Sequence, residues 1–405
     1  MQSEQMVSGR VAQYQNLLKL IGESTADAPR NGLLLKASHG RSIVNCHRLA
    51  EAYKEQSRVA FVTEQFPTEI TFAFDALPWN IESMSIMLAQ SLDVDRIFQL
   101  TQERSVSRDL CSFLRGPYGM MLADCYPRPD VVLTNDQPCE GLAKVIYWSG
   151  QRYNVPVVPL HAPNTYDEGS VRYVAKQLQR VMSDLERVFG TQLNPDSFRA
   201  SVHWSNEARL YFNKTVDILR LHNLPGVSRE LQEIFGMNYF GARQNAQVCK
   251  ALYEEAMELA NAEPIKATRV LWIGQVPEES HEVLRHMSRK VEILYWAPLW
   301  QANSIVLDED DPLRSMAERA ILYHWNAERM GADLERICDE FEVDAFFIAS
   351  VWGCRNMMGL SPMIRDIAIR RKLKYLIINI DLVDRNNYAF NHVKNRVDAF
   401  LELVQ

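Results

Sequence analysis

Short apolar runs alternate with helical stretches along this chain. The clearest run covers residues 344–350, where nearly every position is apolar, as is typical of a strand buried on both faces of a parallel sheet. Runs of the same kind occur at residues 58–62, 129–135, 155–160, 268–274, 291–296 and 374–380. Because these runs alternate with helical spacing, the sequence predicts an α/β fold with parallel sheets.

A long helical stretch separates the two groups of strand-like runs. From residue 170 to about residue 260, apolar residues recur every three or four positions, which indicates amphipathic helices. The first fifty residues have helical spacing as well. We therefore predict an N-terminal helical segment at residues 1–57, a first α/β domain at 58–169, a helical connector at 170–266 and a second α/β domain at 267–405. An all-helical third domain is the alternative for the connector.

Two local predictions depend on proline. Leu77-Pro78-Trp79 is expected to end a helix that begins at Glu69. Ser361 and Pro362 are expected to cap a helix over Met363–Lys372. Cys354 would then lie in the loop between strand and helix, at the sheet edge where open α/β sheets bind their ligands.

Composition and charge argue against several classes of protein. The chain has 44 Lys and Arg against 51 Asp and Glu, and its basic residues are scattered, which argues against a nucleic-acid partner. No run approaches the roughly 18 apolar residues that cross a bilayer. The N-terminus has no export signal, so we expect a cytoplasmic protein. An odd number of cysteines, 7, then indicates thiols that are free, catalytic or metal-bound.

Three of the cysteines lie at the ends of predicted elements. Cys111 follows a helical stretch, Cys139 opens a helix after a strand, and Cys354 follows the strand at 344–350. The Cys-x-x-Cys pairs of zinc ribbons and ferredoxins are absent from the sequence. Two interpretations stay open, namely inert buried thiols and a three-cysteine metal site with one open coordination position. The other four cysteines are expected to pack in the core.

Several short motifs occur in a specific order between about residue 58 and the C-terminus. They are Thr63-Glu64-Gln65-Phe66-Pro67-Thr68-Glu69, Cys111-Ser112, Pro138-Cys139-Glu140-Gly141, Trp352-Gly353-Cys354-Arg355 and Ile380-Asp381. In this order they resemble the 2-hydroxyacyl-CoA dehydratase family, which also contains the subunits of benzoyl-CoA reductase. The resemblance implies two Rossmann-like α/β domains plus helices, in agreement with the pattern of strand-like runs.

The resemblance also implies a site. Cys111, Cys139 and Cys354 would hold a [4Fe–4S] cluster, and Thr63 or Glu64 together with Glu82 would lie near its open iron. In the family mechanism, one low-potential electron converts the thioester to a ketyl radical that expels the α-hydroxyl group. A carboxylate such as Glu64 or Glu82 would then take the acidified β-proton. The alternative for each glutamate is a solvated turn residue.

The implied partners are a second homologous subunit, an acyl-CoA substrate and an ATP-dependent iron–sulfur activator. The activator must be a separate protein, because this sequence has no Gly-x-x-x-x-Gly-Lys-Ser/Thr phosphate loop. We expect a lyase, a 2-hydroxyacyl-CoA dehydratase. The alternatives are an oxidoreductase of the benzoyl-CoA reductase type and a non-catalytic subunit that carries a cluster and relays electrons.

Overall fold

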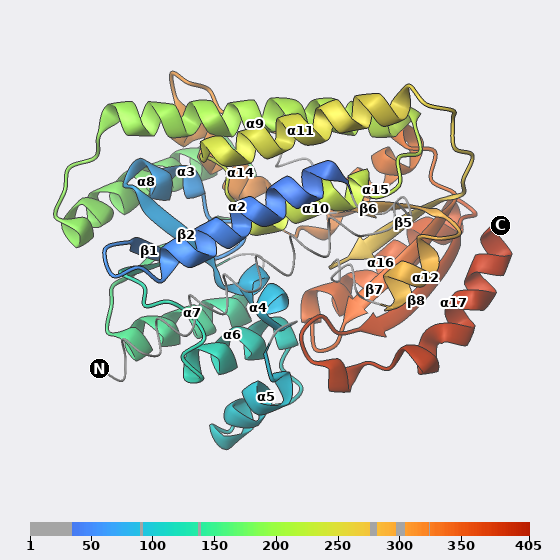
Figure 1. The fold of residues 1–405 in the computed structure, drawn as a ribbon, viewed down its shortest axis with the longest axis horizontal. Helices are drawn as coiled ribbons and strands as arrows, with labels where there is room; N and C mark the ends of the chain where they lie inside the picture. The colour runs from blue at the N-terminus through green and yellow to red at the C-terminus, as the bar shows by residue number, and fades with distance from the viewer. Residues whose placement is uncertain (1–34, 90–91, 137–138, 276–281, 297–303, 324) are drawn as a thin grey trace.

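The computed structural model describes residues 35–405 except 90–91, 137–138, 276–281, 297–303 and 324 (Figure 1). The described residues form two four-stranded parallel sheets, with strand orders β2-β1-β3-β4 and β6-β5-β7-β8. The predicted α/β fold with two parallel sheets is therefore confirmed. The helical spacing of residues 1–34 and Pro138 of the third motif lie outside the described residues.

The first sheet lies between two layers of helices. Its strands are β1 (Arg58–Val62), β2 (Ala76–Asn80), β3 (Val131–Asn135) and β4 (Val157–Leu160). Its connecting helices are α3 (Thr68–Ala73), α4 (Ile81–Ala89), α5 (Val94–Glu103), α6 (Ser112–Leu122) and α7 (Glu140–Tyr153). Phe61 and Val132 pack with α4, α6 and α7. Ala60 and Leu133 pack on the other face with helices α8 (Glu168–Phe189) and α14 (Pro312–Leu322). Burial on both faces explains the unbroken apolar runs.

The second sheet is built in the same way. Its strands are β5 (Arg269–Gly274), β6 (Glu292–Trp296), β7 (Ala345–Val351) and β8 (Lys374–Ile380). The helices between and after its strands are α12 (Glu282–Met287), α14 (Pro312–Leu322), α15 (Ala327–Glu340), α16 (Arg355–Arg370) and α17 (Phe390–Val404), of which α14 packs on the first sheet. Trp272 and Phe347 pack with α12 and α17, while Leu271 and Phe346 pack on the other face with α15 and α16. Every residue of β7 is buried, as its apolar run predicts.

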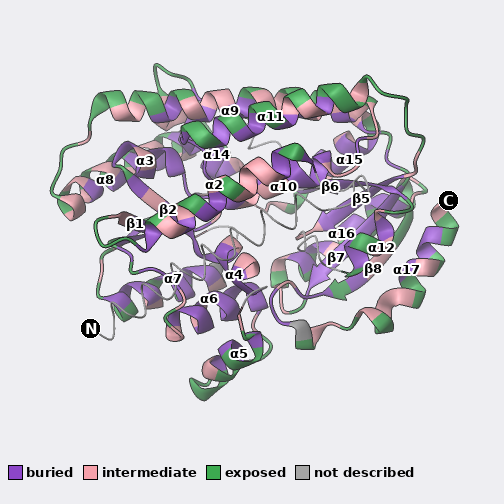
Figure 2. Ribbon diagram, in the orientation of Figure 1, coloured by how far each residue is buried: buried purple, intermediate pink, exposed green. Residues whose placement is uncertain are grey.

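Helices fill the sequence between the two sheets. They are α8 (Glu168–Phe189), α9 (Pro195–Leu221), α10 (Val227–Met237) and α11 (Arg243–Ala260). Helices α9 and α11 lie side by side along one edge of the molecule, and α2 (Lys36–Ala52) packs against α11 (Figure 1). The outward faces of α5 and α9 are exposed, whereas the inner strands β3 and β7 are buried (Figure 2). None of the described helices combines the length and apolarity that spanning a bilayer requires.

The prediction for Leu77-Pro78-Trp79 is wrong. Helix α3 ends at Ala73, and these three residues form the middle of strand β2, which pairs with β1. Proline lacks the N–H that a central strand needs, but β2 lies at the edge of its sheet, where proline is tolerated.

The predicted start of the helix after β7 is also wrong. Helix α16 begins at Arg355, directly after Cys354, so Ser361 and Pro362 lie inside it. The Ser361 hydroxyl donates to the Met357 carbonyl at 2.8 Å instead of capping a helix. Cys354 therefore sits at a helix N-terminus and not in a separate loop.

Candidate active site

A cavity of about 690 Å³ lies between the two sheets. Its wall follows the carboxyl ends of β1, β2 and β3 in the first sheet and of β5 and β7 in the second, where open α/β sheets bind ligands. The volume is ordinary for a small-molecule site. All the site residues predicted from the sequence line it, namely Thr63, Glu64, Glu82, Cys111, Cys139 and Cys354.

Each of the three predicted cysteines is the residue directly before a helix. Cys111 precedes α6, Cys139 precedes α7 and Cys354 precedes α16. Backbone amides in the first turns of α6 and α16 oppose the rise in the pKa of Cys111 and Cys354 that burial causes. The unpaired N–H groups and the positive end of the dipole favour an anion at such a position. Three anion-favouring helix ends therefore face one cavity.

The three thiols lie within electrostatic range of one another. Burial raises the pKa of Cys111 well above its ordinary value, and the neighbouring Cys354 raises it further. Burial also raises the pKa of Cys354, with a smaller contribution from Cys139. Without a metal the Cys111 and Cys354 thiols hold their protons, and a bound metal would displace them.

Gly353 allows the segments that carry two of these cysteines to approach. Its φ of +75° lies in the left-handed region, and a Cβ there would be 2.5 Å from the Asp109 carbonyl oxygen and 2.8 Å from the Cys111 nitrogen. Only glycine fits both the backbone conformation and this contact. The turn after β7 can therefore pack directly on the loop before α6.

Two buried contacts join α6 to the segment after β8. The Ser112 hydroxyl donates to Asp381 Oδ1 at 2.5 Å. The Arg115 guanidinium donates to Asp384 Oδ2 at 2.9 Å, and both side chains are buried. Because these partners are 269 positions apart in the sequence, they hold the two halves of the cavity wall together.

Glu64 and Glu82 form an acid pair at the first-sheet side of the cavity. The Glu64 backbone N–H donates to Glu82 Oε2 at 3.0 Å. Burial, and then the charge of Glu82, raise the pKa of Glu64 to about 8. Burial raises the pKa of Glu82 to about 7, against the effect of that N–H. Because the charge of Glu82 disfavours ionisation of Glu64, the two groups carry about one proton between them near neutral pH.

Asparagine side chains fix the backbone that carries the acid pair. Asn80, the last residue of β2, accepts from the N–H groups of Glu82 and Ser83 at 3.1 and 3.2 Å and so caps helix α4. Asn238, after α10, donates to the Glu64 carbonyl at 2.7 Å. On the neighbouring strand end, the Thr63 hydroxyl accepts the Asn135 N–H at 3.1 Å. Residues from three regions of the chain therefore set the position of the two acids.

The sequence matches the model of one protein family, described as "2-hydroxyglutaryl-CoA dehydratase, D-component", over residues 64–404. The chain belongs to this family. One benzoyl-CoA reductase subunit of Thauera aromatica is 22% identical over 377 residues, which cover 83% of this chain and 86% of that protein. The alpha subunit of (R)-2-hydroxyglutaryl-CoA dehydratase of Acidaminococcus fermentans is 26% identical over 103 residues, 24% of this chain and 22% of that protein. The resemblance drawn from the motifs is confirmed.

Thiolates are the donors that iron–sulfur clusters take, and three thiols line this cavity. Among the described residues, no three His, Cys, Asp or Glu side chains are arranged to hold one metal ion. In a four-iron cluster, each thiolate binds a different iron, so the ligand sulfurs lie farther apart than the ligands of one ion. Cys111, Cys139 and Cys354, at three helix ends around one cavity, are compatible with that wider spacing.

Three cavity residues were not singled out from the sequence. Gln65, Trp325 and Asp136 line the cavity, and each has a buried polar atom without a hydrogen-bond partner among the described residues. The second Asp136 oxygen contacts Nδ1 of His161. Gln65 could have been found because it follows a strand end beside Glu64, whereas no sequence pattern marks Trp325 or His161.

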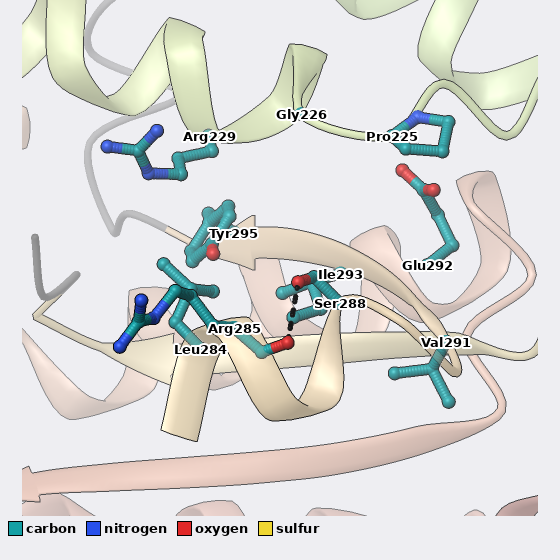
Figure 3. A pocket seen from close by; sticks show the side chains of 10 residues that line it. All are labelled: Pro225, Gly226, Arg229, Leu284, Arg285, Ser288, Val291, Glu292, Ile293 and Tyr295. Atoms are coloured by element: carbon teal, nitrogen blue, oxygen red, sulfur yellow. Dashed lines mark hydrogen bonds between the residues drawn. The ribbon is translucent and has the colours of Figure 1, made fainter. Parts of the chain in front are cut away.

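A second, much smaller cavity of about 30 Å³ lies between α10 and β6. Figure 3 shows Glu292 beside Pro225 at one end of it, and Arg285 of α12 with Ser288, the residue after that helix. This volume is enough for about one water molecule, and it cannot hold a thioester. Of these two cavities, only the larger has room for a thioester.

Proposed function

We propose that this chain is a subunit of an iron–sulfur enzyme that removes water from a 2-hydroxyacyl-CoA. One observation carries the proposal: three thiols at helix N-termini and a proton-sharing acid pair line the same cavity. Membership of the family supports acyl-CoA chemistry.

The thiols would hold the redox cofactor. Cys111, Cys139 and Cys354 would bind a [4Fe–4S] cluster and leave one iron without a ligand from this chain. When bound, such a cluster would supply one low-potential electron to the thioester. The amides at the helix N-termini would stabilise the negative charge of the thiolates.

The acid pair would manage the protons of the dehydration. Glu82, whose carboxylate accepts the Glu64 N–H, is the better base for the substrate β-proton. Glu64, with the higher pKa, would give its proton to the departing hydroxide, so that one proton is taken, one is given and water leaves. The apolar residues Leu110, Phe113 and Leu114 in the cavity wall would limit access of other water.

A reductase of the benzoyl-CoA type is the second candidate. It is supported by the 83% of the chain that aligns with the benzoyl-CoA reductase subunit of Thauera aromatica. The two activities differ in electron balance, because reduction consumes two electrons per product and dehydration returns its electron. A cavity of about 690 Å³ beside the thiols has room for a thioester, which supports a substrate-binding role over an electron relay.

We propose a multi-protein assembly for either reaction. The two relatives are named as subunits, which supports a second, homologous subunit for this chain. The electron would come from a separate ATP-dependent iron–sulfur activator. The substrate would be an acyl-CoA.

The test starts from anaerobic purification of the chain with its partner subunit. After reconstitution we expect a brown protein, and fewer than about three irons per chain would contradict the cluster. Cys→Ser changes at Cys111, Cys139 and Cys354 should each bleach the absorption, whereas Cys249→Ser, in the core of α11, should not. With activator and ATP, a 2-hydroxyacyl-CoA should lose water with catalytic reductant. Consumption of two electrons per product would identify the reductase instead.

A further inference from the structure

We propose that Asp381 is a positioning residue for the redox cofactor. It holds the Cys111 segment through Ser112 and, as a fixed negative charge beside that sulfur, lowers the reduction potential of the cluster. The inference rests on the proposed iron–sulfur function and adds a residue that sets the driving force of the first electron transfer.

The position of Asp381 is defined by contacts with both halves of the chain. The residue follows β8, is 5% exposed and accepts the hydroxyl proton of Ser112, the residue next to Cys111. Because Ser112 directly follows Cys111, the Asp381 carboxylate lies against the segment that carries this sulfur. A side chain from the second half of the chain therefore lies behind a thiol of the first half.

The hydrogen bonds around Asp381 favour its ionised form. Oδ1 accepts the backbone N–H groups of Val383 and Asp384 at 3.0 and 2.9 Å, and Oδ2 accepts the Asn387 amide at 2.9 Å. Burial raises the pKa of Asp381, and these hydrogen bonds to both oxygens oppose that rise.

The negative charge of Asp381 is not cancelled by Arg115 of helix α6. Arg115 donates to Asp384 and to the Leu110 carbonyl, and within the described part of the chain no cationic side chain forms an ion pair with Asp381. A buried charge is screened much less than one in solvent. Adding an electron to a cluster beside such a charge costs free energy, so the reduction potential falls.

The experiment is a redox titration of the anaerobic holo-complex, followed by electron paramagnetic resonance in the absence of substrate. Asp381→Asn keeps the shape of the side chain but removes the charge. We expect its cluster to be reduced about tenfold more readily, a positive shift of about 59 mV for one electron. Ser112→Ala removes the hydroxyl link and keeps the charge, so its potential should not rise. An unchanged potential in Asp381→Asn, or equal shifts in both variants, would overturn the proposal.

Two further variants guard against a structural artefact. Asp109→Asn removes an exposed carboxylate near the same thiol and should shift the potential much less, because solvent screens that charge. If Asp381→Asn loses iron, Asn387→Ala provides the test, since it strips a hydrogen bond from the carboxylate and should lower the potential. A reduction potential in Asn387→Ala equal to that of the wild type would contradict the role of the Asp381 charge. A wild-type complex that binds no iron would refute the proposed function itself.

Discussion

The acid pair in the cavity owes its shared proton to where two neighbouring strands end. Glu64 follows β1 and Glu82 follows β2, and their parallel pairing brings the two side chains together. The sequence identified both residues through the resemblance of the motifs. It could not predict their burial, because an isolated glutamate is usually exposed and nothing near either residue marks the other. Strand β2, which was missed, is the element that joins them.

The first prediction concerns pH. Because the base must be ionised, the rate of the wild-type complex should rise with pH through about 7, where burial has raised the pKa of Glu82. Glu82→Gln should lower the rate about 10²- to 10⁴-fold and remove this limb. Initial rates between pH 5.5 and 9 check it, with Glu103→Gln on the exposed face of α5 as the control. An unaltered pH profile in Glu82→Gln would assign the proton transfer to another group.

At the scale of elements, apolar runs predicted most strands, and the failures have local causes. Strand β2 is short and contains Pro78, a combination that typically indicates a helix end or turn. Helix α16 begins at Arg355 and contains Pro362 in its interior, so the proline correctly indicated a helix but not the residue at which it begins. That start matters for the site, because it places Cys354 at a helix N-terminus.

The second prediction tests the close approach at the turn after β7. Gly353→Ala introduces a Cβ against the Asp109 carbonyl and the Cys111 nitrogen at a positive φ. We expect a loss of about 1–3 kcal/mol in the free energy of unfolding and weaker retention of iron. Gly359→Ala is the matched control, because no atom lies within 4 Å of the Cβ added there, on the helix that follows. If both variants unfold at the same denaturant concentration, the approach is not as tight as described.

The third prediction uses the small cavity between α10 and β6. Glu292 is 2% exposed, and burial raises its pKa to about 8 despite the charge of Arg269 and the Leu224 N–H. A carboxyl pKa that is higher in the folded state makes stability fall as pH rises from about 4.5 to about 8. Glu292→Gln should therefore gain stability relative to the wild type over this range, by about 1–3 kcal/mol at pH 8.

Urea denaturation at several pH values measures this difference. Glu254→Gln, on the exposed surface of α11, should show no such trend. A constant difference between Glu292→Gln and the wild type from pH 5 to pH 8 would mean that Glu292 is ionised in the folded protein throughout.

At the scale of the whole molecule, long-range contacts hold the parts together. Glu69 of α3 accepts both guanidinium N–H groups of Arg319 on α14, at 2.8 and 2.7 Å, although the two residues are 250 positions apart. Arg209 of α9 lies 3.5 Å from the same carboxylate. The sequence predicted the elements but not this junction, because charged residues are usually exposed and their pairing depends on how the helices pack.

The fourth prediction follows from that buried junction. Burial alone would raise the pKa of Glu69, but the charges of Arg319 and Arg209 outweigh it and hold the pKa at about 2. Its contribution to stability is therefore present at neutral pH and is lost as pH falls from about 4.5 towards 2. Glu69→Gln, which leaves two buried guanidinium groups uncompensated, should cost about 3–5 kcal/mol at pH 7.

Chemical denaturation at pH 7 measures this cost. Glu168→Gln breaks an exposed pair with Arg314 of the same helix α14 and should cost far less stability than Glu69→Gln. Equal costs for the two variants would show that the buried carboxylate does not hold α3, α9 and α14 together.

The three cavity thiols are divided between the two halves of the chain. Cys111 and Cys139 come from the first sheet's connections and Cys354 from the second's. If the chain were cut in the loop between α11 and β5, neither fragment would carry the full set. A cofactor that needs all three thiols could then be inserted only after the fragments had associated. The visible absorption of the cofactor would therefore measure their reassembly.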